Sequence, residues 1–204
     1  ILISLLVGAV VLLLLGKNPL DAYVNLLQGS GILPKAKYAG GKSMLTDFFS
    51  FMDCLTPMIF ASLSVAVALK TGLFNIGVSG QMLAAGFITT ITVGYSTLSA
   101  PIAKPLVILV AAAVGTLVGG LIGFLKYRFN INEVVSSIML NYIIEYVVGF
   151  FINTRYVNPI SRQSQTVSSE ARLTLSGTKI GDLKFDIPLG IILAVIVVVI
   201  VKYI

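Results

Sequence analysis

The chain alternates between long apolar runs and shorter polar connections. A helix needs about 20 mostly apolar residues to cross a bilayer, because each residue rises about 1.5 Å through a hydrocarbon core about 30 Å thick. Six apolar runs approach this length, and residues 16–53 and 153–187 remain as long extramembrane loops. We therefore predict an all-α, polytopic membrane bundle that forms a single transmembrane domain. Its six spans cover residues 1–15, 54–70, 81–100, 105–125, 134–152 and 188–204.

Both long loops contain local signals of structure. Asn18-Pro19-Leu20-Asp21 supplies an N-cap residue, a proline at the first helical position and an acid at the third, and Gly29 is a suitable helix terminator. A short helix is therefore predicted here, with an apolar face that lies either on the membrane surface or on the protein itself. In the second loop, residues 173–178 predict a small β-hairpin that turns at Ser176-Gly177.

Composition separates this chain from soluble enzymes. It is 57% hydrophobic and 11% charged, whereas an average soluble domain is about 45–50% apolar and about 25% charged. The absence of histidine and the single cysteine, Cys54, exclude a disulfide framework, a His- or Cys-clustered zinc site and an imidazole-based catalytic triad. The net charge of +6 comes from basic residues scattered between apolar runs. We therefore expect contact with membrane lipid but not with nucleic acid, no catalytic residue and no metal site.

Two predicted spans carry regular stripes of small or polar residues. In 105–125, small residues recur every four positions and leave one helix face almost without side chains, which favours close packing of another helix over a pore-lining role. These residues are Ala111, Gly115, Gly119 and Gly123. In 134–152, polar groups recur at the same spacing, at Ser137, Asn141 and Glu145. Such a stripe normally faces a bundle interior or a water-filled cavity, so this helix is a candidate pathway wall. Structural hydrogen bonding between helices is the alternative for both Asn141 and Glu145.

The segment 70–81 is the most unusual part of the sequence. It places three glycines and several polar side chains between two apolar runs, and each glycine inside a helix costs about 1 kcal/mol relative to alanine. Interrupted helices expose backbone groups that are tolerated only inside protein or beside a cavity, and in transporters they form substrate sites near the midplane. We predict a broken or re-entrant segment near residues 71–81. A plain turn at the membrane surface is the alternative.

Three motifs occur in order along the chain: Leu55–Phe60, Thr71–Gly77 followed by Gly80-Gln81, and Asn132–Ile143. Together they resemble the N-terminal part of permease subunits of bacterial ABC importers for nucleosides and simple sugars, and they are nearer to the nucleoside branch. Branched-chain amino-acid permeases are more distant relatives with similar architecture. The resemblance implies a multi-pass protein of the bacterial plasma membrane that hydrolyses nothing itself. ATP and Mg would sit on a separate ATPase subunit, and no cofactor is expected in this chain.

The resemblance also implies partners and orientation. The partners would be the ATPase subunit, a second permease subunit and an extracellular substrate-binding lipoprotein. The N-terminus and the Lys126 loop would face the cytoplasm, and the two long loops would face outward. Charge alone does not fix this orientation, because most basic residues lie in those long loops. Family members continue beyond this sequence with further spans and a coupling helix that docks on the ATPase.

A nucleoside is neutral and combines a flat base with a polyhydroxyl ribose, so amides, hydroxyls and aromatic faces suit it. We expect hydrogen bonds from Asn75, Ser79, Gln81 and Asn141 and stacking on Phe74 and Tyr142. Ser137 and Glu145 complete the predicted substrate pathway. Transport of simple sugars or branched-chain amino acids is an alternative. A proton-coupled transporter that uses Glu145, or a membrane scaffold that transports nothing, are further alternatives.

Overall fold

The computed structural model describes residues 2–38, 42–180 and 183–203. The described residues form seven α-helices, three short helical turns and one antiparallel pair of strands. The α-helices are α1 (Leu2–Leu14), α2 (Pro19–Gly29), α3 (Met44–Lys70), α4 (Val78–Thr89), α5 (Ala100–Phe129), α6 (Glu133–Phe151) and α7 (Leu189–Tyr203). Two π-helical turns, η1 (Thr90–Gly94) and η2 (Ile152–Tyr156), extend α4 and α6, and η3 (Ser169–Ala171) is a 3-10 turn. The strands are β1 (Thr174–Ile180) and β2 (Leu183–Pro188).

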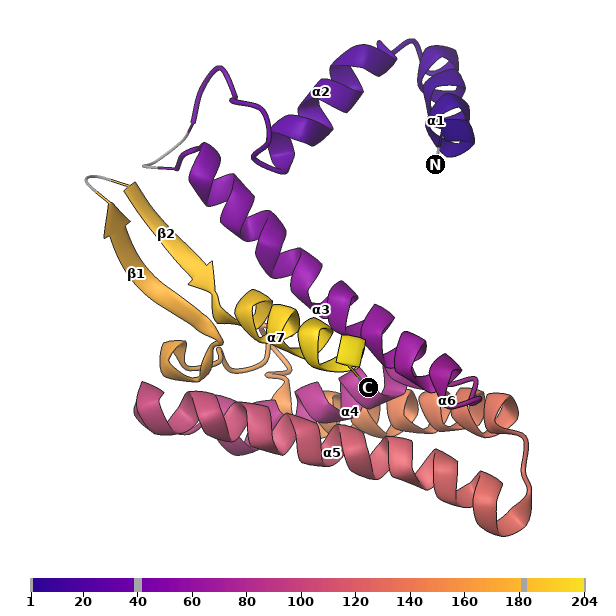
Figure 1. Ribbon diagram of the computed structural model, residues 1–204. Coiled ribbons are helices and arrows are strands. Elements are labelled where there is room, and N and C mark those ends of the chain that lie inside the picture. The colour runs from indigo at the N-terminus through magenta and orange to yellow at the C-terminus, as the bar shows by residue number, and fades with distance from the viewer. Residues whose placement is uncertain (1, 39–41, 181–182, 204) are drawn as a thin grey trace. The chain divides into compact units, whose positions relative to one another are not determined.

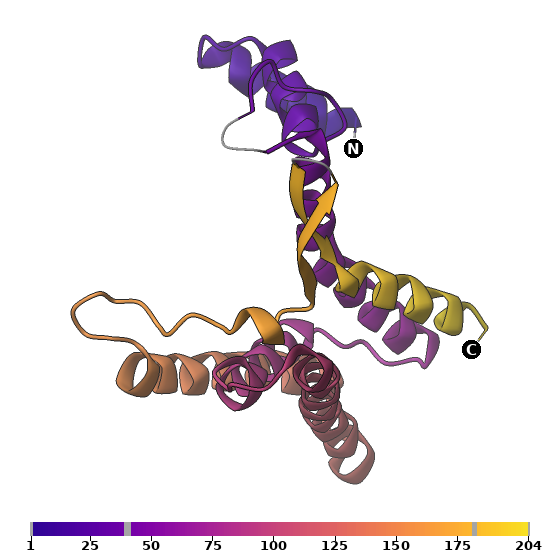
Figure 2. The ribbon, with the colours of Figure 1, turned by 90° about the vertical axis from the view of Figure 1, so that its left-hand side faces the viewer.

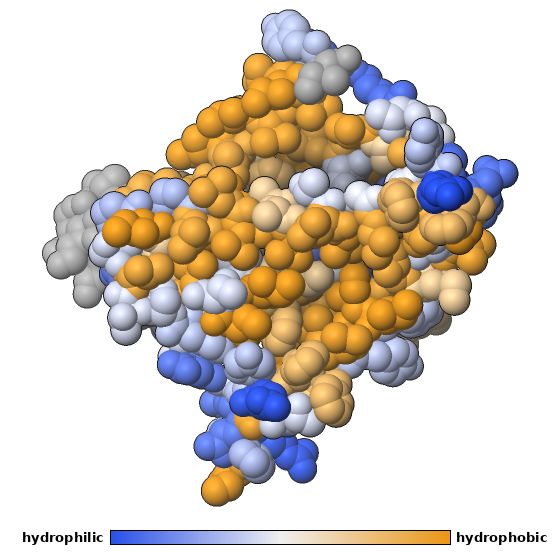
Figure 3. Space-filling view, turned by 90° about the horizontal axis from the view of Figure 1, so that it is seen from below, coloured by the Kyte–Doolittle hydropathy of each residue, from blue (hydrophilic) through white to orange (hydrophobic). Residues whose placement is uncertain are grey.

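Apolar helices overlap all six predicted spans, although their bounds differ. Three of them are long and apolar enough to cross a membrane: Met44–Lys70, Ala100–Phe129 and Glu133–Tyr156. The other three, Leu2–Leu14, Val78–Gly94 and Leu189–Tyr203, are shorter. Hydrophobic residues cover most of the molecular face in Figure 3, as expected where lipid replaces water. The helical membrane fold is thus supported, while the number of six spans stays a prediction.

The chain divides into two compact units. The first contains Ile1–Met58 and Thr174–Ile196, and the second contains Ile59–Leu173 and Val197–Ile204. In the first unit, the predicted helix α2 is confirmed, and the Asn18 side-chain oxygen accepts the Leu20 N–H at 3.0 Å. The Tyr23 hydroxyl donates to the Leu5 carbonyl of α1. Helix α2 therefore packs on its own chain through Tyr23, although Leu20 on the predicted apolar face is 72% exposed.

Helix α3 begins within the loop predicted over residues 16–53. Its start is fixed by a reciprocal pair of hydrogen bonds: the Ser43 side-chain oxygen accepts the Thr46 N–H at 3.3 Å, and the Thr46 side-chain oxygen accepts the Ser43 N–H at 3.2 Å. Lys35 also forms an ion pair with Asp47 at 2.6 Å. Apolar composition could not place this start, because polar side chains satisfy the free backbone amides of the first turn.

The second long loop contains a small β-hairpin, as predicted, within an otherwise helical chain. Strands β1 and β2 pair antiparallel near the end of this loop. The turn predicted at Ser176-Gly177 is wrong, since both residues lie inside β1, and residues 181–182 between the strands lie outside the described part of the chain. The register shifts between Leu175 and Thr178, so one extra residue is accommodated in β1. A glycine inside a strand commonly marks such a bulge instead of a turn.

In the second unit, α4 packs against both α5 and α6 (Figures 1 and 2). Asn130 ends α5 in the left-handed conformation, with φ of 52°. The Asn132 side-chain oxygen then caps α6 by accepting the Val134 N–H at 2.8 Å. Beyond α6, the chain returns to η1, where the Ser168 N–H donates to the Gly94 carbonyl at 2.9 Å. These connections hold the three helices around the candidate site.

Candidate functional site

The predicted interruption between two apolar helices is confirmed over residues 71–77. Helix α3 ends at Lys70, and α4 begins only at Val78. Gly72 has φ of +74°, and the following N–H of Leu73 donates to the Ala68 carbonyl at 2.9 Å. This is the glycine-dependent cap that commonly ends an α-helix. The chain then runs as an extended stretch to the first turn of α4 (Figure 2).

Asn141 joins this interruption to α6. Its side-chain amide nitrogen donates to the Ile76 carbonyl at 3.0 Å, and its side-chain oxygen accepts the Gly80 N–H at 2.9 Å. Asn141 lies near the middle of α6, which runs from Glu133 to Phe151. The first turn of α4 is therefore paired with the middle of a long apolar helix and not with its end.

Close packing surrounds the last residues of the interruption. The Asn75 side-chain oxygen accepts the Gly77 N–H at 2.8 Å. A Cβ atom on Gly77 would lie 2.8 Å from the Cδ1 of Ile122 and 3.2 Å from the Cβ of Ser137. Ser137 is completely buried, and its hydroxyl donates to the Val134 carbonyl at 3.0 Å. Glycine thus fits closely at position 77, where the chain passes between α5 and α6, and a larger residue would have to displace the ends of the Ile122 and Asn75 side chains.

Gln81 meets the small-residue stripe of α5. A Cβ atom on Gly119 would lie 3.2 Å from the Gln81 side-chain nitrogen, which is buried without a hydrogen-bond partner among the described residues. Gly119 therefore gives α4 a close approach to α5. Added Cβ atoms on Gly115 and Gly123 would meet nothing within 4 Å, and Ala111 lines a different cavity near η1. A packing role for the rest of the stripe stays a prediction.

A small cavity of about 90 Å³ borders the interruption, and Asn75, Gly119, Lys126 and Glu133 contribute to its lining. Lys126 and Glu133 form an ion pair at 2.8 Å across the connection from α5 to α6. One end of the interruption thus borders the charged connection between α5 and α6, and its other end contacts Asn141 in the middle of α6. Among the described residues, no three Cys, Asp or Glu side chains gather as a metal site would require.

The predicted pathway residues fall into two groups. Four belong to the cluster just described: Asn75, Gln81, Ser137 and Asn141. The side chains of the other four, Phe74, Ser79, Tyr142 and Glu145, are exposed on the described part of the chain. Phe74 and Tyr142, the predicted stacking residues, are 48% and 59% exposed. The structure therefore brings three partly buried amides and the buried Ser137 hydroxyl together, whereas the two predicted stacking rings are exposed.

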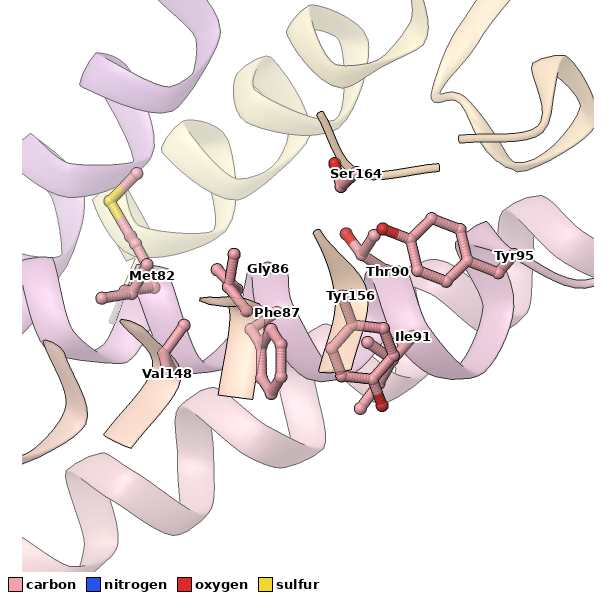
Figure 4. Close-up of a pocket in the computed structure, with 11 residues that line it drawn as sticks. Met82, Gly86, Phe87, Thr90, Ile91, Tyr95, Val148, Tyr156 and Ser164 are labelled. Atoms are coloured by element: carbon pink, nitrogen blue, oxygen red, sulfur yellow. The ribbon is translucent and has the colours of Figure 1, made fainter. Parts of the chain in front are cut away.

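Aromatic residues gather instead around a second cavity, of about 280 Å³ (Figure 4). Its lining includes Phe87, Thr90, Tyr95, Tyr156 and Ser164. Sequence reasoning missed these residues, and the only signal was the spacing of Phe87 and Thr90 on one face of a helix. Nothing in the sequence predicted that Tyr156 and Ser164, which are far away along the chain, would line the same cavity.

Comparison with known proteins identifies the family. Residues 48–204 match the family described as branched-chain amino acid transport system / permease component. The chain belongs to this family. The resemblance inferred from the three sequence motifs is thereby confirmed. The family is described as a permease component of a transport system, and the three long apolar helices indicate that this chain is embedded in a membrane.

Curated relatives refine this assignment. The chain is 30% identical to a nucleoside ABC transporter permease of Lactococcus lactis, over 100% of this chain and 55% of that protein. It is 35% identical to a guanosine ABC transporter permease of Bacillus subtilis, over 75% of this chain and 41% of that protein. A glucose ABC transporter permease of Haloferax volcanii is 29% identical, over 74% of this chain and 37% of that protein. The chain thus spans about half the length of these relatives or less, and no solved structure matches it.

Proposed function

We propose that the chain belongs to the membrane-spanning subunit of an ATP-driven importer that moves nucleosides across a bacterial plasma membrane. Its similarity to permeases named for nucleosides and for guanosine supports this substrate class. In this proposal, a separate ATPase subunit binds ATP and Mg and performs the hydrolysis. A second permease subunit completes the pathway, and an extracellular lipoprotein delivers the substrate.

The structural observation that best supports a pathway here is the double hydrogen bond of Asn141 to the interruption. It holds α4 so that this helix begins beside the middle of α6. Backbone groups of an unwound segment at membrane depth are tolerated only when protein or a water-filled cavity satisfies them. The amide and backbone groups that meet at Asn141 are neutral, which suits a neutral solute that must later be released. The proposed pathway residues are Phe74, Asn75, Ser79, Gln81, Ser137, Asn141, Tyr142 and Glu145.

Simple-sugar transport is the second candidate, and the similarity to a glucose permease favours it. A sugar shares its hydroxyl groups with the ribose of a nucleoside but lacks a flat base. Amide and hydroxyl groups around the interruption would serve either solute. Stacking surfaces would serve only the nucleoside.

Uptake of labelled guanosine tests the proposal. Cells would express the full-length permease with its transport partners, and unlabelled adenosine, ribose or leucine would be added in excess. Competition by adenosine alone is the expected result. Competition by ribose or leucine, or the absence of guanosine uptake, would contradict the nucleoside assignment.

A further inference from the structure

The cavity near η1 and η2 has the composition of a binding site for a flat, neutral solute. We call it the aromatic pocket and define it by Phe87, Thr90, Tyr95, Tyr156 and Ser164, together with Gly86 in its wall. It lies where α4 and α6 end, whereas the interruption lies where α4 begins. The residues that line it include no Asp, Glu, Lys or Arg. Its volume of about 280 Å³ is close to the lower end of the range for small-molecule sites, about 300–1,000 Å³.

Three rings form one side of the aromatic pocket. The centres of the Phe87 and Tyr156 rings lie 5.7 Å apart, with the rings nearly perpendicular at 82°. The centres of the Tyr95 and Tyr156 rings lie 6.2 Å apart, with an angle of 34° between the rings. These contacts fix Tyr156 between its two neighbours. Figure 4 shows the Tyr95 hydroxyl directed towards Thr90, with Ser164 on the same side of the pocket. The pocket therefore offers both aromatic surfaces and hydroxyl groups.

Both π-helical turns contribute to this pocket. Thr90 belongs to η1 and Tyr156 to η2. A π-helical turn inserts a residue into an α-helix and changes the directions of the side chains around it, and such turns are frequent at functional sites. Here, two such turns in two packed helices supply residues to the same cavity. The segment after α6 also reaches the pocket through Ser164 and is held nearby by the Ser168 to Gly94 hydrogen bond.

Gly86 borders both the aromatic pocket and the neighbouring cavity that Ala111 lines. A Cβ atom added to this residue would meet no other atom within 4 Å, although Gly86 is part of the lining. Glycine inside a helix weakens it by about 1 kcal/mol relative to alanine. Its presence in α4 therefore costs helix stability and leaves one wall without a side chain.

We propose that the aromatic pocket is a second substrate subsite, separate from the Asn141 cluster, which binds the base of a nucleoside by stacking. Phe87, Tyr95 and Tyr156 supply the stacking surfaces, because aromatic faces bind any base without requiring its particular hydrogen-bonding pattern. Thr90 and Ser164 supply hydroxyl groups for the ribose. This inference rests on the proposed transport of nucleosides, and it assigns recognition of the base to residues away from the interruption.

A matched pair of glycine substitutions tests this subsite. Gly86→Leu would place a side chain in the pocket, whereas Gly120→Leu adds the same side chain at another helical glycine with no atom within 4 Å of its Cβ position. Gly120 does not line the pocket. In cells with the full-length permease and its partners, Gly86→Leu should raise the KM for guanosine about tenfold, which corresponds to about 1.4 kcal/mol. The maximal uptake rate should change less than twofold, and Gly120→Leu should leave both quantities unchanged.

A second set of variants separates stacking from general packing. Tyr156→Phe keeps the ring and should retain a KM within about twofold of the parent, whereas Tyr156→Leu and Phe87→Leu should each raise it about five- to twentyfold, within the range found for loss of base stacking. Binding can also be followed directly by placing a tryptophan in the pocket. The emission of a Phe87→Trp variant in the purified complex, compared with that of the parent complex, should change with added guanosine but not with added glucose.

The outcomes distinguish the two proposals. If the parent complex imports guanosine but Gly86→Leu, Phe87→Leu and Tyr156→Leu all keep its KM, the subsite is absent and the importer remains. If Gly86→Leu prevents assembly of the complex while Gly120→Leu does not, protein fills the pocket, and the subsite proposal is again wrong. If the parent complex imports no nucleoside at all, the proposed function itself fails.

Discussion

The side-chain amide of Asn141 donates to the Ile76 carbonyl at 3.0 Å and accepts the Gly80 N–H at 2.9 Å. One side chain of α6 thus satisfies two backbone groups at the start of α4. These two partners fix the orientation of the Asn141 amide, because the Ile76 carbonyl requires a donor and the Gly80 N–H requires an acceptor. In surroundings without water, each of these backbone groups would otherwise be left without a partner.

We predict that Asn141→Ala destabilises the permease by about 1–3 kcal/mol, the cost of leaving the buried Gly80 N–H without a partner, because the exposed Ile76 carbonyl loses a weaker, solvent-accessible bond. Asn141→Asp should also destabilise it, since the carboxylate keeps an acceptor for Gly80 but loses the donor to Ile76. Thermal unfolding of the purified complex in detergent measures both effects.

Asn153 provides the control for Asn141. Its side-chain nitrogen in η2 donates to the Gly149 carbonyl of the adjoining α6 at 2.8 Å, a local contact, and among the described residues it bonds to no segment distant in sequence. Asn153→Ala should therefore cost less than about 1 kcal/mol. Equal destabilisation by Asn141→Ala and Asn153→Ala would show that the hydrogen bonds from Asn141 to the interruption contribute no more stability than a local hydrogen bond.

Gly80→Ala should disrupt the same link by steric contact. The added Cβ would lie 2.6 Å from the Asn141 side-chain oxygen and 3.0 Å from its Cα. Since backbone cannot move aside cheaply, we expect lower guanosine uptake and a lower melting temperature. In contrast, Gly120→Ala has free space and should be neutral or stabilising by up to about 1 kcal/mol. A Gly80→Ala variant with parental uptake and melting temperature would contradict the packing described for this turn.

The Lys126–Glu133 ion pair should make only a small contribution to stability. Its atoms approach to 2.8 Å, but the Lys126 side chain remains 35% exposed. Partly exposed pairs typically contribute about 0.2–1 kcal/mol, and salt weakens them. A double-mutant cycle with Lys126→Met and Glu133→Gln should give a small coupling that decreases in high salt. A large coupling that salt does not weaken would instead indicate that the pair is buried in the assembled permease.

Glu145→Gln should leave guanosine uptake within about twofold of the parent. The side chain is exposed on the described part of the chain, and glutamine keeps its ability to form hydrogen bonds while removing the ionisable group. An ATP-driven importer needs no proton site, so an uncoupler should not stop uptake by proteoliposomes supplied with ATP. Loss of uptake in the variant together with uncoupler sensitivity would favour a proton-coupled transporter.

The sequence by itself determined the features that depend on neighbouring residues. Helix α2 starts as predicted because Asn18 and Pro19 act on the adjacent backbone, whereas the left-handed glycine after its end is Gly31, with φ of +72°, and not the predicted Gly29, which is helical. The interruption after Lys70 was predictable for the same reason, since its glycines and polar side chains disfavour a helix locally. The lengths of the apolar runs predicted a helical membrane protein. The three motifs, in their order along the chain, predicted the family.

Tertiary structure alone decided which distant groups meet. Asn141 could be identified as a polar residue in an apolar helix, but its partners Ile76 and Gly80 lie 65 and 61 positions away. The aromatic pocket likewise combines Phe87 and Tyr95 with Tyr156, through the packing of α4 on α6 and the two π-helical turns. Hydropathy and the spacing of residue types along the chain predict how apolar each helix is and where it is interrupted. They do not record the rotation and register of one helix against another, which are set by side-chain packing between segments far apart in the chain.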